Sequence, residues 1–428
     1  MFAPEVRSGI RWLASGFLLM VCSGFGQTYF IAIFAGHLKA DLAITDGQFG
    51  SLFAAGTLAS AALLVWAGKL TDKLSIRWLG VGVLAGLAAT SLAMASVASA
   101  WVLALVLFGL RFFGQGMLTH VAMTAMGRWF NRKRGRAVAM AGLGFPAGEA
   151  VLPLIAVTLI GLLGWRLTWV AAAIALLVVA VPVLIALLRR ERTPTVEHAA
   201  RGDAGPGRSR REWTRGEVLR SPLFYALLPG ILAPPFVQTG TFFNQVTIVE
   251  IKGWELSWFA ASFPVLAGVN VLSALAAGWM IDRFGARRLL PAWLVPLGLA
   301  TLIVSQATRP YVLPVFMALS GLTLGSYATI QGALWAELYG TLHLGAIRAL
   351  AMAGVVFASA LSPALIGILI DAGVALEAQL LAMAAYCLVA ALWMGRCCRG
   401  STAWSRPERA SDNSAPATIR RLRHRGPG

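Results

Sequence analysis

Twelve long apolar segments run through this chain, and they constrain its fold more than any other feature of the sequence. About 20 apolar residues in a helix cross the hydrocarbon core of a bilayer, which is roughly 30 Å thick. The whole sequence is 58% hydrophobic and only 13% charged, a balance typical of membrane proteins. We therefore predict an all-α membrane protein whose twelve transmembrane helices lie near residues 12–36, 47–67, 78–98, 101–126, 137–162, 165–188, 223–248, 257–279, 289–307, 311–336, 346–370 and 374–395.

The distribution of positive charge predicts how these helices are oriented. The formal net charge is +18, from 36 Lys and Arg residues against 18 Asp and Glu residues. When both termini and the even-numbered loops are assigned to one side, 31 basic residues fall there, four fall on the other side and Arg111 stays within a helix. An excess of Lys and Arg marks the cytoplasmic side. We predict that both termini are cytoplasmic and that the charge reflects topology in the lipid bilayer, with no nucleic-acid partner.

A loop motif occurs twice, 210 residues apart, each time directly after an apolar segment. Both copies have a glycine, an aspartate four residues later and basic residues after it. The segment RAVAMAG at Arg136 also reappears as RALAMAG at Arg348. Such internal duplication is how many transporters are built, with the substrate site between the repeats. The motif residues are Gly68, Asp72, Lys73 and Arg77 in the first copy, and Gly278, Asp282, Arg283, Gly285, Arg287 and Arg288 in the second.

The duplication predicts two six-helix bundles, an N-terminal one over residues 1–188 and a C-terminal one over residues 223–396. Residues 189–222 between them are rich in Arg, Glu, Pro, Gly and Ser, which is typical of a mobile polar linker. Residues 397–428 are similar in composition. We predict a basic, disordered cytoplasmic tail there.

With these features the chain resembles the major facilitator superfamily (MFS) over nearly its whole length. The segment from Arg111 to Gly116, RFFGQG, is similar to the arginine-and-glycine signature of the family's fourth helix. The first loop copy departs from the family pattern, because Ser75 replaces the usual glycine and Ile76 replaces a basic residue. The fifth helix lacks the Gly-Pro dipeptide of the antiporter signature, so drug–proton antiport is not supported. The resemblance implies two bundles that rock around a central site by alternating access.

The resemblance also implies that the loop motif latches the two halves together on the cytoplasmic side in one conformation and releases them in the other. The alternative interpretation is that its basic residues only set the topology. The first copy, which lacks the second glycine, is expected to be the less typical one.

Arg111 and Glu149 are the two charged residues predicted near the middle of the membrane. At 1.5 Å per residue, both lie roughly 15–18 Å deep on consecutive antiparallel helices. A charge at this depth costs at least about 2.5–3.5 kcal/mol, so it normally faces a cavity or a partner. Arg111 suits a carboxylate or phosphate ligand, and Glu149 suits proton uptake and release. The alternative is a structural ion pair that fixes the packing of the two helices.

Further polar residues within the helices are candidates for the wall of the cavity, although each one alone is as easily explained by an interhelical hydrogen bond. Three prolines, Pro229, Pro234 and Pro235, predict a broken or bent seventh helix. Glu337, near the membrane interface, is expected to pair with a nearby basic residue. The remaining candidates for substrate binding or coupling are Gln27, Tyr29, Gln115, Gln238, Asn244, Asn270 and Tyr327.

From these features we predict a secondary transporter in the cell inner membrane, a symporter that moves a small organic anion with protons. The alternative within transport is efflux of amphipathic or cationic compounds. A membrane sensor is a third interpretation. A sensor usually carries a substantial soluble signalling domain, and the linker and tail of this sequence look too short for one. The sequence shows no metal cluster, nucleophile motif or phosphate loop, so we predict no enzyme activity, no metal and no cofactor. The predicted partners are a small-molecule substrate, protons and the bilayer, and the predicted state is a monomer.

Overall fold

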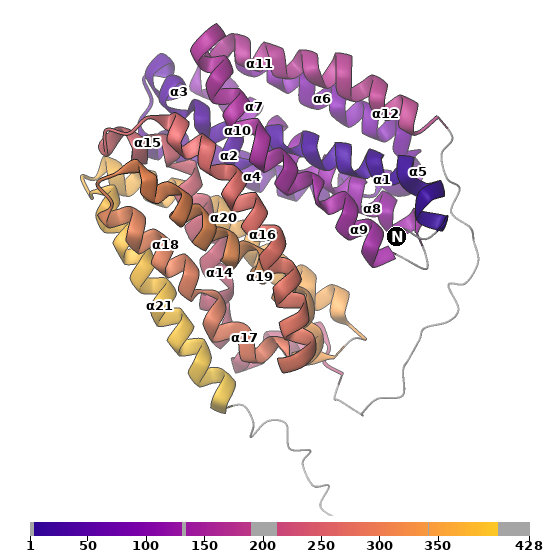
Figure 1. Cartoon of the computed structure of the whole chain (residues 1–428), viewed down its shortest axis with the longest axis vertical. Coiled ribbons are helices and arrows are strands. Elements are labelled where there is room, and N and C mark those ends of the chain that lie inside the picture. Colours follow the sequence, from indigo (N-terminus) through magenta and orange to yellow (C-terminus); the bar gives the residue numbers. More distant parts are fainter. Residues whose placement is uncertain (1–3, 131–133, 190–211, 341, 401–428) are drawn as a thin grey trace, which may run out of the picture.

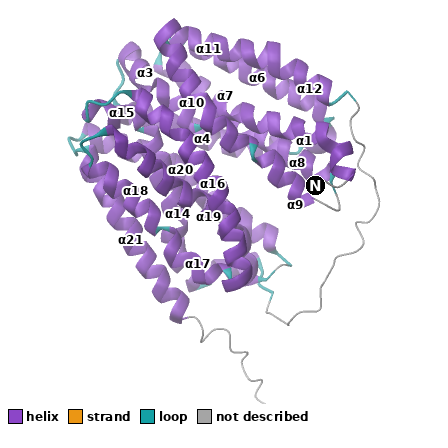
Figure 2. Cartoon of the chain, in the orientation of Figure 1, coloured by secondary structure: helices purple, strands orange, loops and turns teal. Residues whose placement is uncertain are grey.

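The computed structural model describes residues 4–130, 134–189, 212–340 and 342–400, and Figure 2 shows that this part of the chain is helical with short loops. No strand occurs among the described residues, and twelve helical segments there are long and apolar enough to cross a membrane. The predicted all-α membrane fold is confirmed. The first segment consists of α1 (Pro4–Cys22), η1 (Ser23–Gly26), α2 (Thr28–Ile31), η2 (Ala32–Phe34) and α3 (Ala35–Leu42). The second is α4 (Asp46–Ala67) with the short α5 (Leu70–Lys73), the third is α6 (Ile76–Ala95), and the fourth is α7 (Ala100–Leu110) with η3 (Arg111–Leu118) and α8 (Thr119–Trp129). The fifth is α9 (Arg134–Gly142) with α10 (Gly144–Leu163), and the sixth is α11 (Trp165–Ile174) with η4 (Ala175–Ala180) and α12 (Val181–Leu187).

The second set of six repeats this plan with longer uninterrupted helices. A short helix, α13 (Arg215–Leu219), leads into it. The six segments are α14 (Pro222–Phe243) with α15 (Gln245–Ile251); α16 (Leu256–Phe284); α17 (Ala286–Trp293) and α18 (Val295–Gln306); η5 (Pro310–Val312) and α19 (Leu313–Tyr339); α20 (Leu344–Asp371); and α21 (Leu376–Gly400).

The helices gather into two bundles, as Figure 1 shows with indigo and magenta for the first half and orange and yellow for the second. Within the first half, α6 packs against α7 and α11, and α1 packs against α8 and α10. Within the second, α16 and α17 pack against α19, and α18 and α14 pack against α21. The halves meet through α4 with α20, α10 with α16, and α2 with α14.

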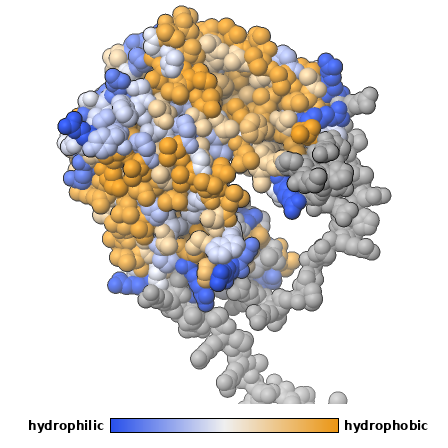
Figure 3. Space-filling model, viewed as in Figure 1, coloured by the Kyte–Doolittle hydropathy of each residue, from blue (hydrophilic) through white to orange (hydrophobic). Residues whose placement is uncertain are grey.

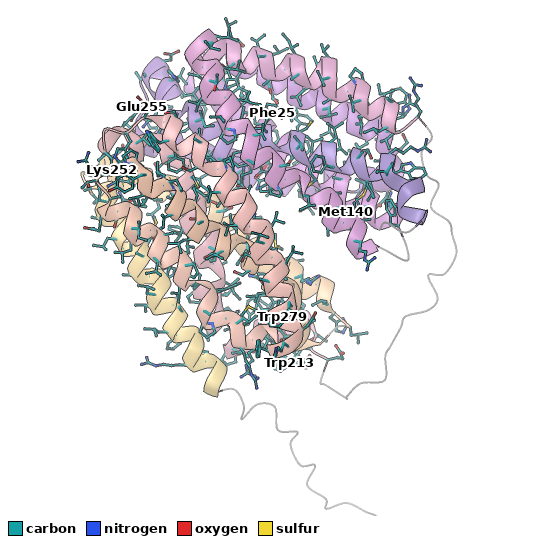
Figure 4. The ribbon with its side chains drawn as sticks, viewed as in Figure 1. Phe25, Met140, Trp213, Lys252, Glu255 and Trp279 are labelled. Atoms are coloured by element: carbon teal, nitrogen blue, oxygen red, sulfur yellow. The ribbon has the colours of Figure 1, made fainter. Side chains whose placement is uncertain are left out.

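The two halves touch at one end and separate at the other. We call the end that carries α5, α9 and α17, where the chain leaves the first half and enters the second, the linker side; the end that carries α3 and α15 is the far side (Figure 1). In the space-filling view of Figure 3, a notch opens between the halves toward the linker side. In Figure 4, Met140 and Trp279 lie on opposite rims of this opening, while Lys252 and Glu255 lie at the far side. The structure is therefore closed at the far side and open at the linker side.

The outer surface is apolar, as expected for a protein surrounded by lipid. Orange, hydrophobic residues cover much of both halves in Figure 3. Large apolar side chains are largely exposed on it, among them Trp101, Leu162, Leu272 and Leu392. An exposed apolar surface of this extent is typical of contact with a bilayer.

Four local features differ from the predictions. The first segment begins at Pro4 and is interrupted around Gln27, because glycines at 24 and 26 favour a tight turn over a helix. The prolines of α14 do not break it, since α20 and α21 pack along this helix and support it. Residues 212–221 of the predicted linker fold onto the second half through α13, and α21 extends to Gly400, four residues beyond the predicted boundary of the tail. Residues 190–211 and 401–428 lie outside the described residues.

Candidate transport site and gates

The interruption of the first segment is the starting point of the site. Residues 23–26 form a 3₁₀ turn, and Gln27 is extended with φ −84° and ψ 154°. A Cβ at Gly26 would stand 2.2 Å from the Leu110 carbonyl oxygen and 2.7 Å from the Gly114 Cα, so only glycine permits this approach. Broken helices in membrane proteins leave backbone groups that need other partners, and they often mark binding sites.

Arg111, on the helical segment that packs against this turn, supplies hydrogen-bond donors to the broken segment. Its Nη1 donates to the Gly26 carbonyl oxygen at 3.3 Å and to Thr28 Oγ1 at 3.3 Å, and its Nε donates to Thr57 Oγ1 at 3.1 Å. Its guanidinium carbon lies 4.9 Å from the centre of the Phe53 ring. Arg111 is the first residue of the π-helical η3, a geometry that is frequent at functional sites. The Arg111 side chain is only 1% exposed, and all these partners are neutral.

Glu149 lies on the opposite flank of the first segment. Its helix approaches α1 closely, because a Cβ at Gly144 would stand 2.3 Å from the Phe17 carbonyl oxygen and one at Gly148 would stand 3.1 Å from that of Val21. Glu149 is 3% exposed, and its Oε2 atom has no hydrogen-bond partner among the described residues.

Arg111 and Glu149 are not joined by an ion pair within 4.0 Å in the described part of the chain. The structural-pair interpretation of these two residues is therefore wrong for this conformation. The helices that carry them, η3 and α10, both pack against the broken first segment.

Tyr29 connects this segment with the second half. Its ring lies between Phe145 of α10 and Phe263 of α16, with ring centres 6.3 Å and 5.7 Å away. Its main-chain oxygen accepts a hydrogen bond of 2.8 Å from Gln245 Nε2, a residue of the second half that the sequence did not single out. The Tyr29 hydroxyl is buried, and no described residue forms a hydrogen bond with it.

The other predicted polar residues are not brought together with this cluster into one set of contacts. Gln27 is buried beside it, and Gln115 is half-buried on η3. Gln238 and Asn244 are engaged within the second half, donating to the carbonyl oxygens of Ser320 and Gly240 respectively. In the same half, Asn270 and Tyr327 are half-buried. The Asn270 main-chain oxygen lies 2.1 Å from the position that a Cβ at Gly325 would take, so the two helices approach closely there. The ring of Tyr327 packs on that of Trp293.

The first copy of the loop motif is held by α8 of its own half. Arg128 forms an ion pair with Asp72 and donates to the Thr71 carbonyl oxygen. His120 Nε2 lies 3.2 Å from the Gly68 carbonyl oxygen. The replacement of glycine by Ser75 has a physical reason, because its hydroxyl caps α6 by accepting from the Trp78 N–H at 3.3 Å.

The second copy is built with different contacts at the equivalent place. Gly285 has φ +82°, a conformation that favours glycine, and it ends α16. Glu337 of α19 accepts a hydrogen bond of 2.8 Å from the Ala286 N–H, where the sequence predicted pairing with a basic side chain. The exposed Arg283 lies over the rings of Trp279 and Phe284. Lys73, Asp282 and Arg288 are exposed, whereas Arg77, Gly278 and Arg287 are half-buried.

The closed far side is fastened by polar residues that the sequence analysis missed. Asp371, at the end of α20, accepts from Thr45 Oγ1 at 2.6 Å and from the Gly47 N–H at 3.0 Å, and thus caps α4 of the other half. Lys39 forms an ion pair of 2.7 Å with Asp46 and reaches Thr247 Oγ1 at 3.4 Å. The contacts of Lys39 with Thr247 and of Asp371 with Thr45 and Gly47 join residues more than 200 positions apart, and such contacts leave no signal in one sequence.

No group of three or more possible metal ligands occurs among the described side chains. The fold, with two six-helix bundles and two buried charged residues in the first of them, is that of a membrane transporter.

The model of the Major Facilitator Superfamily matches residues 16–277, which is more than half of the chain. The protein belongs to this family. The sequence is 25% identical over 324 residues to the MFS transporter asaE of Aspergillus flavus, a match that covers 74% of this chain and 68% of that protein.

Solved structures confirm the fold. A bacterial homologue of the human lysosomal transporter Spinster, in an inward-facing and occupied conformation, superimposes with a TM-score of 0.72 at 16% identity, covering 93% of this chain and 98% of that one. The nucleoside transporter NupG superimposes with a TM-score of 0.68 at 15% identity, covering 91% and 98%. At these identities the likeness concerns the fold alone.

Proposed function

We propose that this transporter moves a small organic anion together with protons, and that Glu149 is its proton-binding group. The observation that carries the proposal is the burial of the Glu149 carboxyl, which has no hydrogen-bond partner for Oε2 and no cation within 4.0 Å among the described residues. A charged carboxylate is costly in such surroundings, whereas the neutral acid is tolerated. The far-side-closed state thus favours the protonated form, and access of water to the carboxyl allows the proton to exchange.

The charge of Arg111 gives the preference for an anion. Arg111 stays protonated under all ordinary conditions, and its contacts here are neutral oxygens and a ring face. With Glu149 neutral, the middle of the first half carries one uncompensated positive charge. An anion in the cleft compensates this charge. When the anion and the proton are released together, the ionised Glu149 carboxylate compensates the charge of Arg111 instead. In this scheme Arg111 acts on the substrate through its field, and Gln27 and Gln115 of the same half are uncharged candidates for contact.

The orientation and the gates follow from charge and geometry. The excess of Lys and Arg on the linker side supports placing that side, with both termini, in the cytoplasm of a cell whose inner membrane holds the protein as a monomer. The two copies of the loop motif lie at this side. We assign them to closing the cleft there when the far side opens.

Transport into proteoliposomes tests the proposal. Purified protein is reconstituted with a pH-sensitive dye inside, and a panel of small mono- and dicarboxylates is offered with and without an inward proton gradient. We expect one class of anion to accumulate with the gradient and to acidify the lumen. Glu149→Gln is expected to abolish gradient-driven accumulation while retaining exchange of substrate across the membrane.

Two results contradict the proposal. Full gradient-driven accumulation in Glu149→Gln removes the proton assignment. Export of cationic dyes that is lost in Glu149→Gln but kept in Arg111→Gln supports efflux of amphipathic cations in place of anion transport.

A further inference from the structure

Tyr29 contacts both the helix that carries the proton site and the second half. Phe145, Glu149 and Leu152 lie on one face of α10, at positions i, i+4 and i+7. The Tyr29 ring packs on Phe145. A Cβ at Gly24 would stand 2.6 Å from the Tyr29 hydroxyl and 2.5 Å from Leu152 Cδ1, so the hydroxyl end reaches the other end of this face. The side chain of Tyr29 therefore runs along the stretch of α10 that carries Glu149.

The main chain of Tyr29 is fastened to the other half. Gln245 is the first residue of α15 and has no exposed surface. Its Nε2 donates to the Tyr29 carbonyl oxygen at 2.8 Å, while its Oε1 has no partner among the described residues. The helix α15 packs against η2 and α3 of the first half, so this bond crosses the far-side contact between the halves. When the far side opens, the two residues separate and the bond is lost.

Few other titratable groups in the described part of the chain face Glu149 from the helices packed on α10. Within the membrane, the hydroxyl of Tyr29 lies along this face of α10, and the adjacent α1 carries the buried thiol of Cys22. Arg111, on η3, donates to the Gly26 carbonyl oxygen of η1 and forms no ion pair with Glu149. The charged residues Arg136 of α9, Arg166 of α11, and Asp282 and Arg283 of α16 lie in the first or last turn of their helices, and Arg11 of α1 lies eleven residues before Cys22 at the end of that helix.

We infer that Gln245 is a positioning residue for proton coupling: by holding the Tyr29 main chain, it keeps the tyrosine ring over Glu149 while the far side is closed. This inference rests on the proposed role of Glu149. In the closed state the held ring excludes water from the carboxyl. Opening releases Tyr29 from Gln245, the ring is free to move, and water reaches Glu149. The same bond thus links opening of the far side to the protonation of Glu149.

The test measures far-side opening as a function of pH, with protons as the only ligand. Spin labels are placed at Ala98 and Thr308, two exposed far-side positions in different halves, after Cys397 and Cys398 are replaced by serine. Cys22 and Cys387 are buried and are left in place. Pulsed electron resonance on the full chain in nanodiscs gives the ratio of open to closed molecules across a pH series. The pH response is defined as the ratio of open to closed molecules at the alkaline plateau divided by the same ratio at the acidic plateau.

The wild type is expected to open at alkaline pH, and Glu149→Gln is expected to lose this response. Gln245→Leu is expected to reduce the response at least about fivefold, the lower end of typical coupling between sites. The matched control is Gln379→Leu, because Gln379 is also a buried glutamine whose Nε2 donates to a carbonyl oxygen, that of Val374, at 3.0 Å within one half. The control is expected to keep the full response.

Two more variants separate coupling from simple stability. Tyr29→Leu removes the ring but keeps the carbonyl, and we expect it to weaken the response as Gln245→Leu does, with no further loss in the double variant. Gln245→Glu is expected to favour the closed far side as the wild type does only at acidic pH, because only the protonated carboxylic acid donates a hydrogen bond to the Tyr29 carbonyl oxygen.

The outcomes are distinct. If Gln245→Leu shifts opening equally at every pH, the bond merely stabilises the closed state and the inference is overturned. If the wild type shows no response, or Glu149→Gln keeps it, the proposed function fails first and takes this inference with it.

Discussion

Gly50 provides the sharpest test of how tightly the far side closes. A Cβ at this position of α4 would stand 2.3 Å from the Pro363 carbonyl oxygen and 2.7 Å from its carbonyl carbon. Both are backbone atoms of α20, in the other half, so no side-chain rotation relieves the contact. Because ordinary contact begins at 3.4 Å, Gly50→Ala requires the halves to separate by about 1 Å at this point.

The size of the effect follows from the cost of overpacking. An added methyl group in a well-packed contact typically costs about 1–3 kcal/mol. The cost applies only to the closed state, since the contact with Pro363 does not exist once the halves part. The gain in helix propensity from glycine to alanine is the same in both states and cancels. We expect the ratio of open to closed molecules to rise about 5- to 150-fold.

The assay is the distance between labels at Ala98 and Thr308, measured at one pH in nanodiscs. The control is Gly82→Ala on α6, because nothing lies within 4 Å of the Cβ position there. It receives the same methyl group and the same gain in helix propensity. If Gly50→Ala gives the distance distribution of Gly82→Ala, the two halves do not close as the structure describes.

Three further substitutions have expected outcomes. Asp371→Asn should increase far-side opening in the same distance measurement, because hydrogen bonds to a charged group contribute about 1.5–3 kcal/mol and neutral ones about 0.5–1.5 kcal/mol; an unchanged distribution contradicts this. Ser75→Ala should lower the free energy of unfolding by about 0.5–2 kcal/mol through loss of the cap on α6, seen as a lower midpoint in thermal unfolding. Gly285→Ala should lower it by about 1–3 kcal/mol, because alanine is strained at φ +82° and ψ 151°; an unshifted midpoint contradicts either expectation.

The fold could be predicted because its signals are local and repeated. Each transmembrane helix carries its own evidence in a run of apolar residues, and the duplicated motif at Gly68 and Gly278 relates the halves without any knowledge of contacts. The interruption at Gln27 was not predicted, although Gly24 and Gly26 were visible. Glycine is common in membrane helices, so it signals a break only when the close approach of Gly26 to Gly114 is known.

The candidate site was predicted only in part, since depth along a helix says nothing about which way a side chain points. Arg111 and Glu149 were correctly recognised as buried charges, because a charged residue in an apolar run is conspicuous. The alternative of a structural ion pair between them is wrong for this conformation, because no ion pair joins them within 4.0 Å. Gln245 and Asp371 were missed for a related reason. Their partners, Tyr29 and Thr45, are far away in the sequence, and only the packing of the halves brings them together.

The difference between the halves suggests how the work of transport is divided. The counterparts of Arg111 and Glu149, 212 residues later, are Thr323 and Leu361. Thr323 is fully buried and donates to the Trp293 carbonyl oxygen, and Leu361 is partly exposed. The second half therefore has no charge at either place, and α16, α19 and α20 cross it without interruption. The buried charges Arg111 and Glu149 and the extended break at Gln27 lie in the first half, so we assign to the second half the wall against which the first half closes. Transferring the pair by substituting Thr323→Arg and Leu361→Glu would bury charges without the broken segment that accommodates them, and we expect such a variant to fail to fold.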